Sequence, residues 1–261
     1  DVVVSVSPIS AAELLRQSLW HRCFAAVAVS ATLRALGTFE RFAATTGLPQ
    51  HATTLAVPGA FDYANAAVLS VPDIGADGGE AHAHTEALIS SLVALIDPAE
   101  GTLVLFSSRR QMETVAEALT GQMHTPPLVQ GQFSHGEIIR RHRAAVDNGD
   151  GSVIFGLASF AEGLDLPGDY CRHVVIAKLP FAVPDSPLHA AQAEWLETRG
   201  LNPFRVMTLP DASLRLIQAC GRLLRNEEDR GRVTILDRRL VTKFYGKQLL
   251  DSLPPFRREI S

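Results

Sequence analysis

The chain has 261 residues, of which 46% are hydrophobic and 20% are charged, so it can bury one large core or two small ones. Its formal net charge of −4 excludes a polycation that binds nucleic acid through a global positive field, and any such contact needs a local basic surface. No apolar run is long enough to span a membrane, and the first residues, "DVVVSVSPIS", have no charged n-region or cleavage site, so we do not expect export. The chain does not begin with Met, and we expect it to be a piece of a longer cytoplasmic protein.

The spacing of the cysteines argues against a zinc site and against a secreted disulfide framework. Cys23, Cys171 and Cys220 lie far apart and lack the CxxC pairs of a zinc site or the even count of a secreted disulfide framework. We therefore expect free, buried thiols in a reducing cytosol.

Apolar, β-branched runs alternate with helical patterns along the chain, which predicts βαβ units and an α/β fold with a parallel sheet. The expected strands are residues 2–6, 25–31, 102–107, 127–131, 152–157, 173–179 and 232–237. Residues 47–80 are rich in Pro, Gly and Ala, which is typical of a connector. We expect this connector to separate a leading segment, residues 1–50, from the main α/β body, residues 51–261.

Three helices have clear start signals. Ser108 is followed three residues later by Gln111, and Ser134 by Glu137, which is the spacing of a capping box. Ser186 precedes a proline, which predicts an N-cap followed by Pro at the first helical position.

A polar stripe is predicted on the helix that contains the sequence "IQACGRLLRNEEDRGR". Its members follow one another at spacings of three and four residues: Arg215, Gln218, Arg222 and Arg225. The neighbouring buried face consists of Leu216, Ile217, Cys220, Leu223 and Leu224. Gly221 inside a helix costs about 1 kcal/mol relative to Ala, which indicates that something approaches the backbone there. Taken alone, the stripe favours a solvated basic face over an anion-binding site.

The segment "GLASFAEGLDLPGDY" follows an expected strand directly, at the end of a parallel strand where ligands bind in open α/β sheets. Glu162 and Asp165 can accept hydrogen bonds from a ribose or orient an arginine. The alternative is a tight turn at Gly163 and Pro167 with two solvated acids, and the segment alone does not decide between them.

Several polar residues elsewhere allow two interpretations. Ser107 and Ser108 end a strand and begin a helix, which offers hydroxyl and N–H groups to a phosphate, although such serines are usually only caps. His82 and His84 are two residues apart, which favours two surface side chains on nearly opposite sides of a helix, and we assign no metal site. The basic residues Arg140, Arg141 and Arg143 favour a solvated face over a phosphate contact.

The order of these segments along the chain resembles that of the motifs of a known protein family. The "LVLFSS" corner, the "FAEGLDLPG" loop and the "QACGRLLR" helix resemble motifs IV, V and VI in the second RecA-like motor domain of superfamily 2 helicases. The longer stretches "SFAEGLDLPGDYCRHVVIAKLPFAVPDSP" and "VSATLRALGTFERF" are similar to XPD-like iron–sulfur helicases of the DinG type, over nearly the whole chain. The resemblance implies a RecA-like, P-loop NTPase-like fold, which is a doubly wound, mainly parallel sheet flanked by helices.

This resemblance also implies roles for the residues at a nucleotide. Arg225 is the expected arginine finger, and Arg222 is expected to brace it or to touch the γ-phosphate. The other expected nucleotide-site residues are Gln218 as a sensor, Asp165 facing the ribose, and Glu162 and Gly163 holding the loop. Residues 51–261 are then the second motor domain, and residues 1–50 the edge of the first domain or a hinge.

For nucleic acid, the resemblance implies contacts from Ser107, Ser108, Ser159, Lys178 and Phe181. The "SAT" segment from Ser30 to Thr32 is similar to motif III, which couples nucleotide state to DNA grip in that family. The implied partners are single-stranded and forked DNA and the first motor domain of the same protein, in the cytoplasm near the nucleoid and not at a membrane.

Three features of such helicases do not occur in the sequence: a G-x-x-x-x-G-K-[ST] phosphate loop, a DEAH-like acidic motif and four clustered cysteines. In the resembled family all three lie in the first motor domain and its insertion. We therefore expect ATP, Mg²⁺ and an iron–sulfur cluster in the full-length enzyme, and a fragment that alone is inactive and binds none of them tightly. The alternative is a nucleotide-responsive module that binds anions or nucleic acid without motor activity.

Overall fold

The structure is a computed structural model that describes residues 4, 6–182 and 186–260. The chain divides into two compact units, one of Asp1–Pro58 with Phe181–Leu214 and one of Gly59–Pro180 with Arg215–Ser261. These units group residues by proximity. That residues 1–50 are the edge of the first motor domain or a hinge, and residues 51–261 the second motor domain, stays a prediction.

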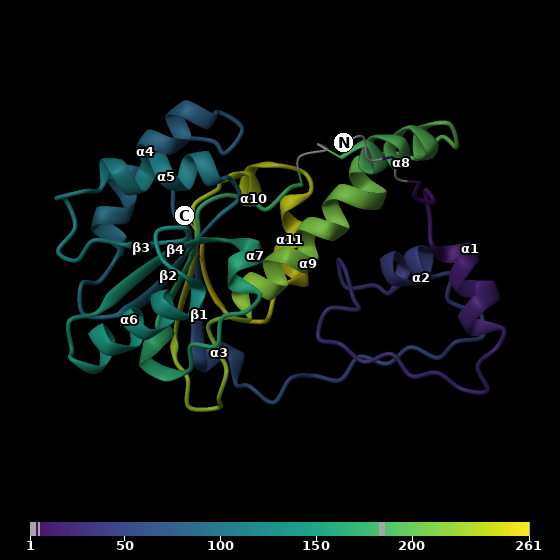
Figure 1. The fold of residues 1–261 in the computed structure, drawn as a ribbon, viewed down its shortest axis with the longest axis horizontal. Coiled ribbons are helices and arrows are strands. Elements are labelled where there is room, and N and C mark those ends of the chain that lie inside the picture. The colour runs from purple at the N-terminus through teal and green to yellow at the C-terminus, as the bar shows by residue number, and fades with distance from the viewer. Residues whose placement is uncertain (1–3, 5, 183–185, 261) are drawn as a thin grey trace. The chain divides into compact units, whose positions relative to one another are not determined.

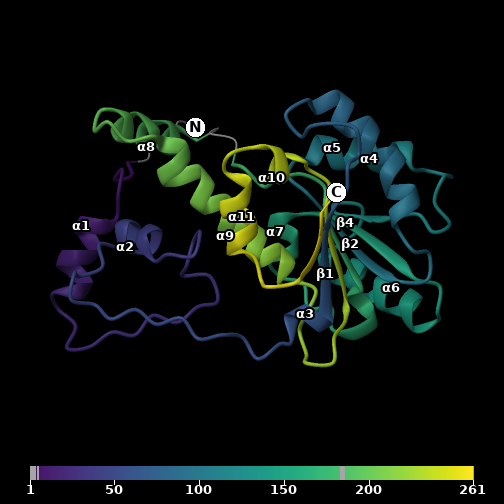
Figure 2. The same cartoon turned by 180° about the vertical axis from the view of Figure 1, so that it is seen from behind.

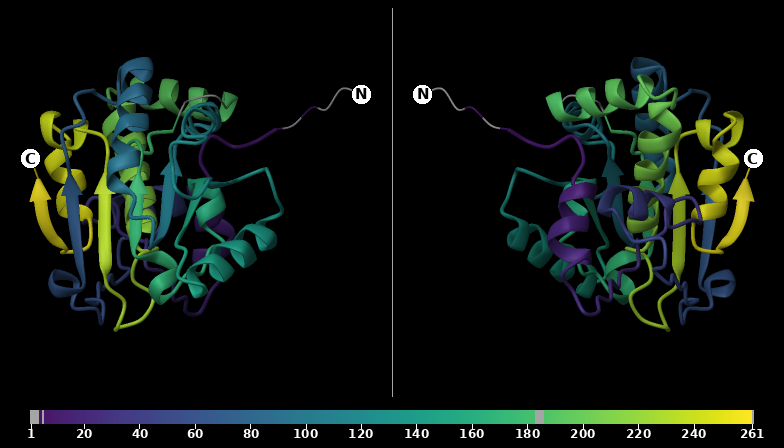
Figure 3. Two further views of the ribbon diagram at one scale, coloured as in Figure 1. Left: turned by 90° about the vertical axis from the view of Figure 1, so that its left-hand side faces the viewer. Right: turned by 90° about the vertical axis from the view of Figure 1, so that its right-hand side faces the viewer.

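A parallel sheet forms the centre of the second unit. Within the described residues it has seven strands in the order β3-β4-β2-β5-β6-β1-β7. The strands are β1 Ala67–Val71, β2 Gly101–Phe106, β3 Leu128–Val129, β4 Ser152–Leu157, β5 His173–Ile176, β6 Gly231–Ile235 and β7 Arg257–Ile260. Every recorded pair is parallel, and the strand arrows in Figure 3 point the same way. The predicted α/β class and its parallel sheet are confirmed.

Five of the predicted strands are confirmed as β2 to β6, and the remaining predictions need correction. Residues 25–31 form no strand, and Val27 and Val29 are 88% and 87% exposed. The prediction at 2–6 lies largely outside the described residues. Two strands were missed: β1 lies inside the segment predicted as a connector, and β7 is an edge strand of mostly charged residues. Its sequence, "RREI", gives no apolar signal.

Helices cover the sheet of the second unit, and further helices lie in the first unit. Their bounds are α1 Ala12–Leu15, α2 Glu40–Thr46, α3 Tyr63–Ala66, α4 Ala81–Leu95, α5 Arg109–Ala118, α6 His135–Asp147, α7 Ala158–Ala161, α8 Pro187–Glu197, α9 Leu209–Cys220, α10 Arg239–Thr242 and α11 Gly246–Ser252. Two π-helical turns, η1 Arg16–Trp20 and η3 Phe204–Thr208, and one 3₁₀ turn, η2 Gly168–Cys171, complete the order.

The predicted N-caps are confirmed. The hydroxyl of Ser108 accepts from the Gln111 N–H at 3.4 Å, and that of Ser134 from the Glu137 N–H at 3.3 Å. Ser186 caps α8 in the same way, with a proline in the first turn. Each cap satisfies an N–H group that has no partner inside its helix.

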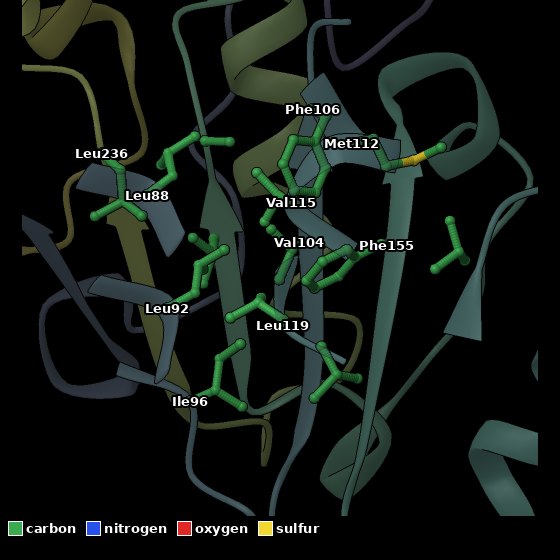
Figure 4. Close-up of a cluster of buried hydrophobic side chains, with 14 residues drawn as sticks. Leu88, Leu92, Ile96, Val104, Phe106, Met112, Val115, Leu119, Phe155 and Leu236 are labelled. Carbon is green, nitrogen blue, oxygen red and sulfur yellow. The ribbon is translucent and has the colours of Figure 1, made fainter. Parts of the chain in front are cut away.

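The core lies between the sheet and the helix pair α4 and α5, which run side by side in the opposite views of Figures 1 and 2. Figure 4 shows Leu88 from α4 and Val115 from α5 beside the strand residues Phe106 and Phe155, whose ring centroids are 5.2 Å apart. Leu103 lies three residues before Phe106 in β2, so its side chain points to the opposite face of the sheet, and it is buried as well. Both faces of the sheet are therefore covered, as a doubly wound fold requires.

In the first unit, polar contacts join the leading residues to the start of α9. The guanidinium of Arg41 donates to both carboxylate oxygens of Asp211 at 2.8 and 3.0 Å. The N–H of Leu36 donates to the hydroxyl of Ser213 at 3.2 Å. Paired donors on a planar guanidinium hold a carboxylate in a fixed orientation.

Two expectations about single side chains were wrong. Cys23 is exposed, whereas Cys171 and Cys220 are buried as predicted. His84 is fully buried and not a surface residue, because it lies one turn before Leu88 on the face of α4 that packs on the sheet. His82 is exposed. Among the described residues, no helix has the length and apolar character that crossing a membrane requires.

Candidate nucleotide and nucleic-acid site

The acidic loop Glu162–Asp165 follows β4 and the short helix α7. A sharp reversal starts it: a Cβ on Gly156 would lie 2.7 Å from the ring of Phe160, so glycine lets this ring fold back on the strand. Gly163 lies against the ring of His135 from α6. The loop therefore sits at the carboxyl end of β4, which is the end of a parallel strand where ligands bind.

The arginines that follow α9 are not on a helix. α9 ends at Cys220, so Gly221, Arg222 and Arg225 lie in the turns beyond it, and the predicted stripe through Arg225 was wrong in its geometry. The buried carboxylate of Asp229 stabilises these turns, because it accepts from the N–H of Arg225 at 2.7 Å and of Asn226 at 2.9 Å. These N–H groups would otherwise continue the helical ladder.

The structure brings the two arginines onto the acidic loop. Arg222 donates to the carbonyl oxygens of Leu164 at 3.0 Å and of Glu162 at 3.4 Å. Arg225 donates through Nε to Oδ1 of Asp165 at 3.1 Å and through Nη2 to the carbonyl oxygen of Leu164 at 3.2 Å. The side chains of Arg225 and Asp165 are 33% and 69% exposed, so solvent screens their ion pair to about 0.2–1 kcal/mol.

Electrostatics differ between the two arginines. Burial, followed by the nearby charge of Arg225, lowers the pKa of Arg222, although a guanidinium stays protonated in proteins. Arg222 is therefore the more buried, bracing partner, and Arg225 the more accessible charge. Gln218 is exposed on α9, and Arg215 on the same helix donates to the carbonyl oxygen of Pro180 at 3.3 Å.

The predicted nucleic-acid residues lie in several places. Ser107 and Ser108 follow β2 and Lys178 follows β5, and these strands are neighbours, so the three line one open pocket of about 630 Å³. Gln111, Thr85 and Arg110 from α4 and α5 line it as well. Burial, followed by the charge of a nearby arginine, lowers the pKa of Lys178.

The other predicted contacts lie outside this pocket. Ser159 is exposed on α7. Phe181 belongs to the first unit, where its ring centroid is 5.6 Å from that of Phe204. Ser30 and Thr32 also belong to the first unit and form a local turn in which the Thr32 N–H donates to the Ser30 hydroxyl at 3.2 Å. Their functional roles stay predictions.

Comparison with known proteins identifies the family. Residues 89–256 match the family model described as the helicase C-terminal domain. The chain belongs to this helicase C-terminal domain family. It is 43% identical over 265 residues to a protein of Photobacterium profundum called ATP-dependent DNA helicase DinG, a match that covers 100% of this chain and 38% of that protein. The Escherichia coli protein of the same name is 37% identical over 95% of this chain and 35% of its own length.

Solved structures agree on the fold. A structure titled XPD helicase superposes with a TM-score of 0.51 at 17% identity, over 75% of this chain and 36% of that one. The Xpd4 protein of S. tokodaii gives a TM-score of 0.50 at 14% identity, over 82% of this chain and 43% of that one. The predicted RecA-like class and the resemblance to DinG-type helicases are thus confirmed.

Within this helicase domain, sequence reasoning missed two residues of the site. Asp229 was not singled out, although its position after "RNEE" allows it to cap the turn that carries Arg225. Arg143 was predicted to lie on a solvated face, but its Nη2 donates to the carbonyl oxygen of Asp165 at 2.7 Å. The sequence feature that could have indicated this contact is the neighbouring His142. It is buried one turn after Ile138, so Arg143 lies at the edge of the buried face of α6.

Among the residues that the structure describes, no group of three or more His, Cys, Asp or Glu side chains is arranged to hold a metal ion. Two of the three cysteines are buried, and burial raises the pKa of Cys171 and of Cys220 to about 12, which disfavours the thiolate that binds metals.

Proposed function

We propose that this chain is the second motor domain of an ATP-dependent DNA helicase, and that it works by closing against a first motor domain that holds most of the nucleotide. The main observation behind this proposal is that the guanidinium groups of Arg222 and Arg225 both bind the acidic loop at the carboxyl end of β4. Family membership and similarity to DinG helicases over the whole chain support the proposal. The chain spans 38% of the length of that first relative, which leaves room there for another motor domain.

In this proposal Arg225 is the arginine finger. Phosphoryl transfer spreads negative charge over the transferring group, and a positioned arginine accelerates such reactions by typically 10³ to 10⁵. The ion pair between Arg225 and Asp165 is weak because it is exposed, so a triphosphate can replace Asp165 as the partner of the guanidinium. Asp165 is then released to accept a hydrogen bond from the ribose.

The neighbouring residues hold this arrangement. Arg222 braces the loop through the carbonyl oxygens of Glu162 and Leu164, and from there it can also reach the γ-phosphate. Gly163 gives the loop a close approach to α6. Gln218, exposed on α9, senses the nucleotide or the opposing domain.

Nucleic acid is proposed to follow the carboxyl ends of the strands. Ser107, Ser108 and Lys178 present hydroxyl groups and a positive charge in one open pocket, and such groups bind the phosphate backbone without reading sequence. Ser159 and Phe181 are proposed as further contacts, and Ser30 and Thr32 as the coupling segment.

The proposed enzyme needs parts that this sequence does not contain. ATP and Mg²⁺ require a phosphate loop and acidic ligands, and an iron–sulfur cluster requires four thiolates. We propose that the first motor domain supplies all of these and that the present chain alone does not hydrolyse ATP.

The test is Arg225→Ala in a full-length helicase that carries this chain. We expect DNA-stimulated ATP turnover to fall by at least about 10², with single-stranded DNA binding nearly unchanged, because the charge acts on the transferring phosphoryl group. Arg225→Lys should restore little, since a lysine lacks the planar fork. ATP turnover and DNA binding are measured side by side for each variant.

Arg141→Ala is the control, because Arg141 binds Glu137 of its own helix and should leave turnover almost unchanged. A proportional loss of DNA binding and turnover in Arg225→Ala, or no loss of either, contradicts the finger. The first result would favour a binding module without motor activity.

A further inference from the structure

The three arginines of α6 have different surroundings. Arg140 and Arg141 both donate to the carboxylate of Glu137 on their own helix, at 2.8 and 2.7 Å through Nε. These bonds lower the pKa of Glu137 to about 2. The side chain of Arg143 instead extends away from α6, and its Nη2 donates to the carbonyl oxygen of Asp165 at 2.7 Å. Only Arg143 among the three therefore has a recorded hydrogen bond to the acidic loop in the described residues.

Arg143 is itself held in place. Its guanidinium carbon lies 5.2 Å from the ring centroid of Tyr170, within the range of a cation–π contact. The Tyr170 hydroxyl donates to Oδ1 of Asp147 at 2.8 Å, and Nε2 of His142 lies 2.7 Å from the carbonyl oxygen of Tyr170. A carbonyl oxygen only accepts, so His142 donates through Nε2. Two residues of α6 besides Arg143 thus fix the ring on which its guanidinium rests.

The hydrogen bonding of Arg143 is incomplete. Its Nε is buried and has no hydrogen-bond partner among the described residues. Leaving a buried donor unpaired is unfavourable, so the other contacts of the side chain must offset this cost. The side chain keeps the orientation in which Nη2 reaches Asp165.

Asp165 is consequently held from two sides. Arg225 binds its carboxylate, and Arg143 binds its carbonyl oxygen. The contact to the carboxylate is the one that a nucleotide would exchange. The contact to the carbonyl oxygen is independent of the side chain, so it can persist and fix the direction in which the carboxylate projects.

We infer that Arg143 is a positioning residue that holds the main chain of Asp165, so that the Asp165 carboxylate meets a ribose hydroxyl of the bound nucleoside triphosphate. The inference rests on the proposed function, in which Asp165 faces the ribose. Arg143 acts through Asp165 and does not touch the nucleotide. Its effect therefore belongs to nucleotide affinity and not to the phosphoryl-transfer step, which separates it from Arg225.

The test uses a full-length helicase that carries this chain and compares ATP with 2′,3′-dideoxy-ATP in DNA-stimulated turnover. We expect the unsubstituted enzyme to have a KM about tenfold higher for the dideoxy nucleotide, since one charge-assisted hydrogen bond is lost. Arg143→Ala should raise the KM for ATP by about three- to tenfold and change kcat less than about twofold. It should then show little further loss with the dideoxy nucleotide.

Two matched variants complete the design. Arg140→Ala removes an exposed arginine of the same helix that binds only Glu137 in the described contacts, and it should behave like the unsubstituted enzyme with both nucleotides. Arg143→Lys keeps a donor for the carbonyl oxygen and should restore much of the discrimination. This second variant also serves if Arg143→Ala does not fold.

The outcomes are distinguishable. If Arg143→Ala discriminates between the two nucleotides as well as the unsubstituted enzyme does, the inference is overturned. If the unsubstituted enzyme hydrolyses ATP without discriminating, the ribose role of Asp165 fails and the inference fails with it, while the motor proposal stands. Peptide-level hydrogen exchange gives an independent readout: Arg143→Ala should speed exchange around Leu164, and an unchanged rate would show that Arg143 does not hold the loop.

Discussion

At the scale of single residues, the partners of the site could be predicted only in part. The order of the motifs along the chain indicated that Asp165 and Arg225 belong to one site, and the two side chains are indeed in contact. The path of the backbone between them could not be predicted, because spacings of three and four residues suggest a helix wherever no competing acceptor is known. Asp229 is that acceptor: its carboxylate binds the N–H of Arg225 in the turns that follow the end of α9 at Cys220.

We expect Asp229→Ala to destabilise the domain by about 2–4 kcal/mol, because it leaves three N–H groups without their charged acceptor. They belong to Gly168, Arg225 and Asn226. Urea unfolding checks the size of the effect. Asp169→Ala is the control, since Asp169 is exposed and its ion pair with Arg172 is at the surface. Equal stability of the two variants would contradict the capping role of Asp229.

At the scale of elements, burial on both faces decides what the sequence reveals. The central strands β2 and β4 are continuous apolar runs because helices cover both of their faces, and such runs are the strongest signal for a parallel sheet. The edge strand β7 has no such signal. Residues 25–31 have the pattern of a strand but no recorded ladder partner among the described residues, and a strand needs a neighbour for its backbone groups.

The sheet contains a buried histidine that predicts sensitivity to acid. Burial, followed by the charge of Arg232, lowers the pKa of His173 in β5 from 6.5 to about 3. The unfolded chain therefore binds one more proton than the folded chain between these values, and stability falls as the pH falls from about 6.5 toward 3. Above pH 6.5 both states are neutral at this residue, and it contributes no pH dependence.

Substitution of His173 should reduce this dependence. Urea unfolding of His173→Asn between pH 7 and 4 should show a slope of stability against pH that is smaller by up to about one proton. His82→Asn makes the same substitution at an exposed histidine and serves as the matched control. A slope that is the same in His173→Asn and in the unsubstituted chain would show that His173 is not the titrating group.

At the scale of the whole molecule, the absence of a sequence motif is easier to establish from the sequence than the boundaries of the compact units. A phosphate loop is a continuous motif, so it can be ruled out by inspection of residues 1 to 261. Compact units are not continuous here: Phe181–Leu214 groups with the leading residues, although it lies between the two segments of the second unit in the chain. No local composition signal marks such a return, because it depends on contacts between distant segments.

The missing phosphate loop leads to a prediction for the isolated chain. The contacts proposed for ATP in this chain come from Arg225 and Asp165, which are exposed, and from Arg222 and Gln218 beside them, and contacts of this kind in water supply about 1–3 kcal/mol together. A dissociation constant of 1 mM already requires about 4 kcal/mol, so we expect calorimetry with Mg²⁺ and ATP to give binding weaker than about 1 mM and no turnover. A cooperative thermal transition by circular dichroism establishes that the chain is folded in the same buffer. Micromolar binding that Arg225→Ala abolishes would mean that the arginines form a complete nucleotide site in this chain. In that case the chain is a nucleotide-binding module in its own right, because half of a divided motor site has no means of holding a triphosphate that tightly.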